Sequence, residues 1–195
     1  MATYYLSDYM INGGAVVHGE NGGQEVEVTG IVRIPAGTDL AAGDRLVFMR
    51  FPEGTIFLEE IFRCPDLDDG AGLTLDLGYQ RPLVDPGKAY DATTNPYTDN
   101  AIATADDDFF EEDSTIGQAG GIAILAYAGF TVTSQGVTGV AGDVDLCATV
   151  AIGAATASTA GGQVKWTVRA LLNDEQTMGA FSGRDALNYT TNYDI

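Results

Sequence analysis

Side chains that commonly carry out catalysis are scarce in this sequence of 195 residues. It has one histidine, His18, and two cysteines, Cys64 and Cys147. One histidine cannot build a multi-histidine metal centre, and two cysteines cannot build a four-cysteine zinc site. A serine–histidine mechanism would have to use His18, which lies in a glycine-rich stretch, and no GxSxG motif surrounds serines such as Ser134 or Ser182. We therefore predict no catalytic residues and no cofactor-binding residues.

Carboxylates are abundant, with 28 acidic residues against 9 basic ones. Three aspartates before Gly70 resemble the start of a calcium loop, but position twelve of that loop is Leu77 instead of glutamate (Asp66, Asp68, Asp69). Six more acids occupy residues 106–113, which we predict to be helical, and neighbouring acids on a helix do not converge on one ion. We predict no metal site. A carboxylate pair for glycoside hydrolysis stays open, because that chemistry depends on separation in space.

The formal net charge of −19 restricts the kinds of partner. Such a chain repels nucleic-acid phosphates, so we predict no nucleic-acid partner. No apolar run approaches 18 residues and the N-terminus lacks the basic and apolar regions of a signal peptide, so we predict neither a membrane span nor export. The two cysteines are expected to be free and buried, although pairing stays open. The acidity fits either a salty environment or solubility at high copy number.

Alternation of apolar and polar residues predicts an all-β protein. Period-two patterns or short apolar runs bounded by turn residues recur along the chain, at residues 24–34, 45–51, 55–63, 73–79, 121–127, 129–134, 143–152 and 162–172. In 45–51 both faces are apolar, which is typical of a strand covered on both sides. About eight strands without alternating helices predict an antiparallel β-sandwich, plausibly of jelly-roll type, with one short helix.

The remaining segments divide the chain into three parts. We expect an N-terminal arm over 1–23, a sandwich domain over 24–173 and a C-terminal tail over 174–195. Residues 80–103 are polar and contain three prolines, so they are predicted to be a long excursion loop. Residues 104–117 are the predicted helix, because three aspartates precede Phe109 and Phe110 and suit a helix N-terminus.

Several short motifs follow one another in a fixed order along the chain. They read AAGDRLVFMRFPEGTIFL (41–58), LDDGAGLTLDLGY (67–79), YD (90–91), ADDDFF (105–110), STIGQAGG (114–121), DVDLCATV (143–150), AGG (160–162) and VKWTVRALL (164–172). They include a "GD-apolar strand-PxG" turn, a "DLGY" strand, an acidic-aromatic stretch and a final hairpin joined by small residues. Over residues 24–172, this order resembles that of head-associated structural proteins of tailed bacteriophages and prophages.

The resemblance implies a capsid decoration or cement protein. Such a protein would be made in the cytoplasm of a bacterial host and would bind the outside of a phage head in many copies. Its partner would be the major capsid protein, and a homo-oligomer, with a trimer favoured, would brace neighbouring capsomers. No catalytic residues are carried over from the family, so the chain is expected not to be an enzyme.

Two alternatives remain beside this interpretation. One is a tail, knob or fibre-base component of the virion. The other is a carbohydrate-binding sandwich module, which would gather exposed aromatic side chains on one sheet face. The available tyrosines for such a face are Tyr4, Tyr5, Tyr9, Tyr79, Tyr90 and Tyr97.

Overall fold

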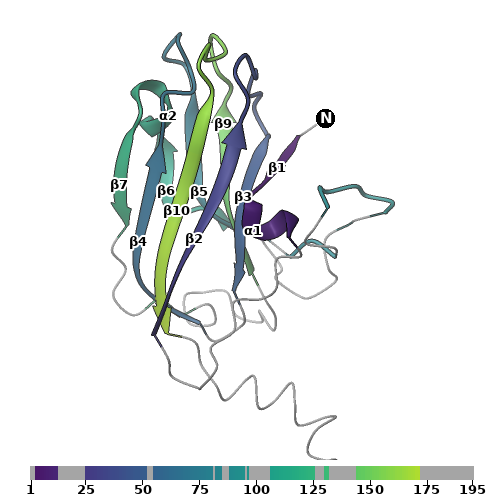
Figure 1. Ribbon diagram of the computed structural model, residues 1–195, viewed down its shortest axis with the longest axis vertical. Coiled ribbons are helices and arrows are strands. Elements are labelled where there is room, and N and C mark those ends of the chain that lie inside the picture. Colours follow the sequence, from purple (N-terminus) through teal and green to yellow (C-terminus); the bar gives the residue numbers. More distant parts are fainter. Residues whose placement is uncertain are drawn as a thin grey trace, which may run out of the picture.

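A computed structural model describes most of the predicted sandwich. The described residues are 3–12, 25–51, 55–80, 82–84, 88–94, 96, 106–125, 130–131 and 144–171. Within them the chain forms two five-stranded sheets that face each other (Figure 1). The first sheet, here sheet A, has the order β1-β3-β9-β5-β6; the second, sheet B, has the order β2-β10-β4-β7, with β8 added on β4. The fold is an all-β sandwich, as predicted.

The strand bounds match the alternating segments of the sequence closely. Each predicted strand has a counterpart, although only two residues of 129–134 form a described strand. The strands are β1 (Tyr4–Leu6), β2 (Glu25–Ile34), β3 (Arg45–Phe51), β4 (Ile56–Cys64), β5 (Thr74–Gln80), β6 (Asp106–Ser114), β7 (Gly121–Leu125), β8 (Phe130–Thr131), β9 (Val144–Ile152) and β10 (Gly162–Leu171).

Strands far apart in the sequence pair in a nested pattern. β2 pairs with β10, β3 with β9, β4 with β7, and β5 with β6, all antiparallel. β10 also pairs with β4, and β9 with β5, and these contacts join the strand pairs into the two sheets. Only β1, which runs beside β3, pairs in parallel within the described residues. The nesting brings the two ends of the domain, β2 and β10, side by side in sheet B.

An aromatic cluster fills the space between the sheets. Trp166 of β10 is fully buried, and its ring meets those of Phe48, Phe62 and Phe110 edge-on, with centroids 5.3 to 5.8 Å apart. Such tilted contacts suit the charge distribution of aromatic rings. The sheets also approach closely at Gly30, where an added Cβ would lie 2.7 Å from the carbonyl oxygen of Phe48. The core therefore depends on its large aromatic side chains and, at Gly30, on the absence of a side chain.

The helix predicted over 104–117 is wrong. Residues Asp106–Ser114 form β6, an edge strand that pairs with β5. The helical interpretation used local charge only, whereas the strand buries Phe110 against the core and places Phe109 on the ring of Tyr79. Tertiary packing of this kind outweighs a small local preference. A four-residue helix, α2 (Ile116–Ala119), follows the strand instead.

Part of the predicted N-terminal arm is folded against sheet A. Residues 4–6 form β1, and Asp8–Ile11 form the helix α1, which Ser7 caps by accepting a hydrogen bond from the Met10 N–H. The glycine-rich part of the arm, the predicted excursion loop beyond residue 96 and the predicted tail lie outside the described residues. Neither described helix is long and apolar enough to cross a membrane.

Candidate interaction surface

The outer face of sheet A is covered by the N-terminal elements. Met10 of α1 lies with Val47 and Cys147 in a fully buried cluster, and Tyr4 and Leu6 of β1 pack against it. The Ser7 hydroxyl donates a hydrogen bond to the Phe48 carbonyl and fixes the connection between β1 and α1. β3 is consequently buried on both faces, as its doubly apolar sequence predicted.

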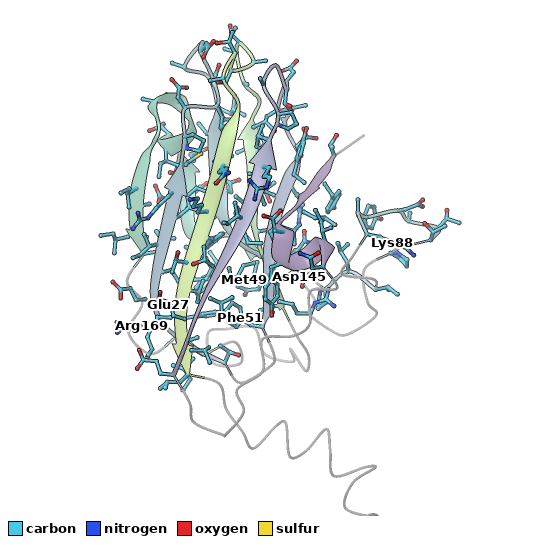
Figure 2. All side chains as sticks on the ribbon, viewed as in Figure 1. Glu27, Met49, Phe51, Lys88, Asp145 and Arg169 are labelled. Atoms are coloured by element: carbon cyan, nitrogen blue, oxygen red, sulfur yellow. The ribbon has the colours of Figure 1, made fainter. Side chains whose placement is uncertain are left out.

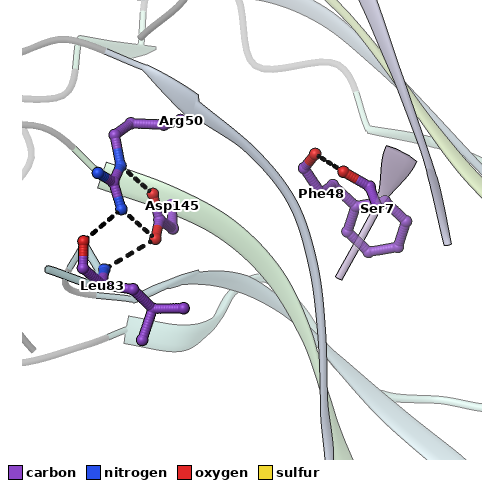
Figure 3. A network of polar contacts seen from close by, with 5 residues as sticks. All are labelled: Ser7, Phe48, Arg50, Leu83 and Asp145. Carbon is purple, nitrogen blue, oxygen red and sulfur yellow. Dashed lines mark hydrogen bonds and ion pairs between the residues drawn. The ribbon is translucent and has the colours of Figure 1, made fainter. Parts of the chain in front are cut away.

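A buried ion pair attaches the start of the excursion loop to the same sheet (Figure 3). Arg50 on β3 donates from Nε to Asp145 Oδ1 at 2.6 Å and from Nη2 to Oδ2 at 2.9 Å. Leu83 completes the network: its carbonyl accepts from Arg50 at 2.8 Å, and its N–H donates to Asp145 at 3.1 Å. Asp145 is fully buried, so charge and hydrogen bonds are matched inside the protein. This arrangement attaches the Leu83 segment to β3 and β9.

The tyrosines considered for carbohydrate binding do not form an exposed platform. Tyr79 is buried, and Tyr5 and Tyr9 pack against the core. Tyr4 and Tyr90 meet at 5.4 Å between ring centroids, which holds the excursion loop against β1. Tyr97 lies outside the described residues. The described tyrosines therefore attach segments to sheet A.

Asp68, one of the aspartates that resembled a calcium loop, accepts hydrogen bonds from the surrounding backbone. Its two carboxylate oxygens accept hydrogen bonds from five backbone N–H groups, two of which belong to the connector between β9 and β10 (Gly70, Gly72, Leu73, Ala155, Thr156). Burial opposes ionisation of this carboxyl, but the N–H groups of Thr156, Ala155, Gly70 and Gly72 outweigh it and hold the pKa of Asp68 well below its usual range. Asp68 thus ties two loops together.

The described residues contain no group of side chains that could form a metal centre. Among the described histidine, cysteine and acidic residues, no three gather where they could hold an ion. His18, Ser134 and Ser182 lie outside the described residues. Cys64 and Cys147 are buried and are not joined in a disulfide, as expected, and burial raises the pKa of the Cys64 thiol to about 12. A thiol in this state is a poor nucleophile.

Glu60 is an ionisable group that the sequence analysis did not single out. It lies on β4 facing the core, is 1% exposed, and accepts a hydrogen bond of 2.8 Å from Trp166 Nε1. None of the described residues forms a hydrogen bond with its Oε1 atom. Burial raises the pKa of Glu60 to about 8, against a smaller lowering by the Trp166 hydrogen bond. The adjacent sequence, with Glu59 beside it, gives no sign of which glutamate is buried.

Among the described residues, the outer face of sheet B is uncovered, unlike that of sheet A. No described segment lies over it, and its outward side chains form rows across β2, β10, β4 and β7 (Figures 1 and 2). Successive rows contain Ile31, Lys165, Arg63 and Ile122, then Thr29, Thr167, Ile61 and Ile124. Ile122 and Ile124 are 60% and 66% exposed. Isoleucines this exposed on neighbouring positions are typical of an interaction surface.

Basic residues are concentrated on this face of a very acidic protein. Four of the nine basic residues of the chain lie here: Arg33, Arg63, Lys165 and Arg169. Arg169 is paired with Glu25 at 2.9 Å and Glu59 at 3.2 Å, and Arg33 with Asp8 at 2.7 Å. Arg63 and Lys165 stand opposite each other in neighbouring strands, and among the described residues no side chain forms an ion pair with either of them. Within the described part of the chain, these two side-chain charges are not neutralised.

Comparison with known proteins identifies structures of the same fold. Neither a protein-family model nor a curated protein sequence matches the chain. A chain from the capsid of Ralstonia phage GP4 superposes with a TM-score of 0.58 at 20% identity, over 88% of this chain and 99% of that chain. A chain from the cyanophage Pam1 capsid asymmetric unit gives a TM-score of 0.51 at 23% identity, over 81% of this chain and 91% of that one. This protein therefore shares its fold with chains from two phage capsid structures.

Proposed function

We propose that this protein is a structural component of a phage virion and associates with the capsid. The observation that carries the proposal is the fold likeness, which extends over 99% and 91% of the two chains from phage capsid structures. A match along almost a whole neighbouring chain relates complete sandwiches, rather than a common substructure inside unlike proteins. Fold alone does not define function, so the other features of the molecule matter.

The finer form of the proposal is a decoration or cement protein on the outside of the head, bound to the major capsid protein. The motif order resembles that family, and the nested strand pairing supports a jelly roll. The buried polar groups described above, Arg50, Asp145 and Asp68, all serve to attach loops to the sandwich. A protein that stabilises a shell needs such rigidity and an open face, and it needs no catalytic residues. We accordingly propose that it is not an enzyme.

Fractionation of particles tests the proposal. Virions of the phage or induced prophage that encodes the chain would be purified, separated into heads and tails, and analysed by mass spectrometry. We expect the protein in the head fraction, in a ratio to the major capsid protein that stays constant through repeated purification. Presence only with tails would favour the tail, knob or fibre-base alternative. Absence from particles would overturn the proposal.

A second experiment tests the position and the stabilising role. A cryo-EM map of the head should show density for the sandwich on the outer surface. Particles made without the gene should release DNA at a lower temperature or lower osmotic stress than wild-type particles, and added purified protein should restore them. An equal release temperature with and without the protein would contradict the cement function.

A further inference from the structure

We propose that the open face of sheet B is a self-association surface that receives the acidic edge strand β6 of a second copy. The receiving surface is a patch of five residues, here the basic–apolar patch: Ile61, Arg63, Ile122, Ile124 and Lys165. The surface that docks on this patch is the edge strand β6, here the acidic edge, whose acidic residues include Asp108, Glu111 and Glu112.

The patch combines two properties that a protein interface needs. Arg63 and Lys165 face each other across neighbouring strands. On the other side of β4, Ile122 is in register with Arg63, and Ile124 is in register with Ile61. Ile122 and Ile124 are more than half exposed, so covering them removes apolar area from water. The two cations have no ion-pair partner among the described residues. An occupant should therefore bring carboxylates next to an apolar contact.

The acidic edge supplies those carboxylates. β6 ends sheet A, as β7 ends sheet B, and both lie on the same side of the sandwich (Figure 1). Asp108 and Glu112 are exposed and Glu111 is half-buried, and no described residue forms an ion pair with any of the three. Charges on an edge strand prevent direct strand-to-strand pairing between copies. The contact we propose therefore uses side chains, with the acids of one copy on the cations of the next.

Net charge selects this orientation. Two chains of formal charge −19 repel each other in most relative orientations. The approach that places the acidic edge against Arg63 and Lys165 replaces repulsion with attraction, and electrostatic complementarity of this kind fixes orientation. Because two different surfaces meet, the contact is heterologous, and such contacts build rings when the rotation closes. A ring agrees with the trimer that the resemblance to phage decoration proteins implies.

Charge reversal of each surface tests the contact on the full-length protein. Masses would be measured by size-exclusion chromatography with light scattering, and folding by circular dichroism. We expect wild type to form a closed oligomer. The variants R63E/K165E and E111K/E112K should each weaken association by roughly 100-fold, since each places like charges together. Combining all four substitutions should restore the oligomer, because the charges are again opposite.

The control changes the same amount of charge at positions outside the five-residue patch. Arg33 and Lys88 are exposed and lie outside the patch, so R33E/K88E alters the net charge as R63E/K165E does but should leave the oligomer intact. A monomeric wild type would overturn the inference, as would double variants that keep the wild-type mass. Failure of the fourfold variant to restore association would also overturn it. The proposal that the protein is a virion component is tested separately, by the fractionation of particles, so the two proposals can fail independently.

Discussion

Glu60 is a carboxylic acid held neutral in an apolar core. With a folded pKa of about 8 and a usual value of 4.5, it carries its proton in the folded state and loses it on unfolding at neutral pH. The unfolded chain therefore binds fewer protons between these pH values, and stability falls as pH rises through that window. The hydrogen bond from Trp166 compensates the burial only in part.

Replacing Glu60 with glutamine should remove this pH dependence. The variant E60Q keeps an acceptor for Trp166 and cannot ionise. The free energy of unfolding of wild type should drop by about 3 kcal/mol between pH 5 and pH 8, and E60Q should lack that drop. Denaturant titrations at several pH values measure it. E59Q is the matched control, because Glu59 lies on the outer face. Equal slopes for wild type and E60Q would show that Glu60 is ionised in the fold.

The Arg50–Asp145 pair should be costly to break. The variant D145N removes the negative charge and leaves the buried guanidinium of Arg50 uncompensated, so we expect a loss of about 3–5 kcal/mol in unfolding free energy. The control is D8N, which breaks the exposed Arg33–Asp8 pair and should change the unfolding free energy far less than D145N, because solvent screens that pair. Thermal and denaturant unfolding measure both variants. A small effect of D145N would mean that water reaches Arg50.

At the scale of elements, the loop before β5 and the connector between β9 and β10 are joined through one carboxylate. Asp68 accepts N–H groups from both segments, and Asp68 also forms an isolated bridge with Ala157. The sequence signals only a turn here, because the donors on the connector are 87 and 88 residues away. Because the pKa of Asp68 is lower in the folded protein than in the unfolded chain, this carboxylate stabilises the fold at pH values above its usual pKa. That contribution is lost as the pH falls from the usual pKa through the folded pKa.

The variant D68N should loosen both segments together. Asparagine offers one acceptor oxygen in place of two, so several N–H groups lose their partner, at a cost of about 2–4 kcal/mol. Hydrogen exchange should become faster at Gly70 and Gly72 and also at Ala155 and Thr156. D69N is the control, because Asp69 is exposed and accepts only a 3.3 Å hydrogen bond from Thr159. Faster exchange confined to one segment would contradict the joint role.

At the scale of the molecule, the two buried thiols report on the intactness of the sandwich. Cys64 belongs to sheet B and Cys147 to sheet A, and both are almost inaccessible. Neither should react with a thiol reagent at pH 8 in the native protein, and both should react in denaturant. The native labelling rate should therefore follow global opening. Rapid labelling of Cys147 alone would instead show that α1 and β1 detach from sheet A.

The sequence by itself determined the class of fold and eight of the ten described strands, all except β1 and β6. Alternation in β2 and β10 comes from the pleat, which is local, so Trp166 inward and Lys165 outward follow from the period of two. Tertiary structure decided the rest. Asp106–Ser114 is a strand because it pairs with β5 and buries Phe110 in the core. Tertiary structure also decided that Glu60 is buried rather than Glu59, and that the described N-terminal elements cover sheet A and leave the outer face of sheet B uncovered. These outcomes depend on which distant segments meet, and local patterns contain no record of that.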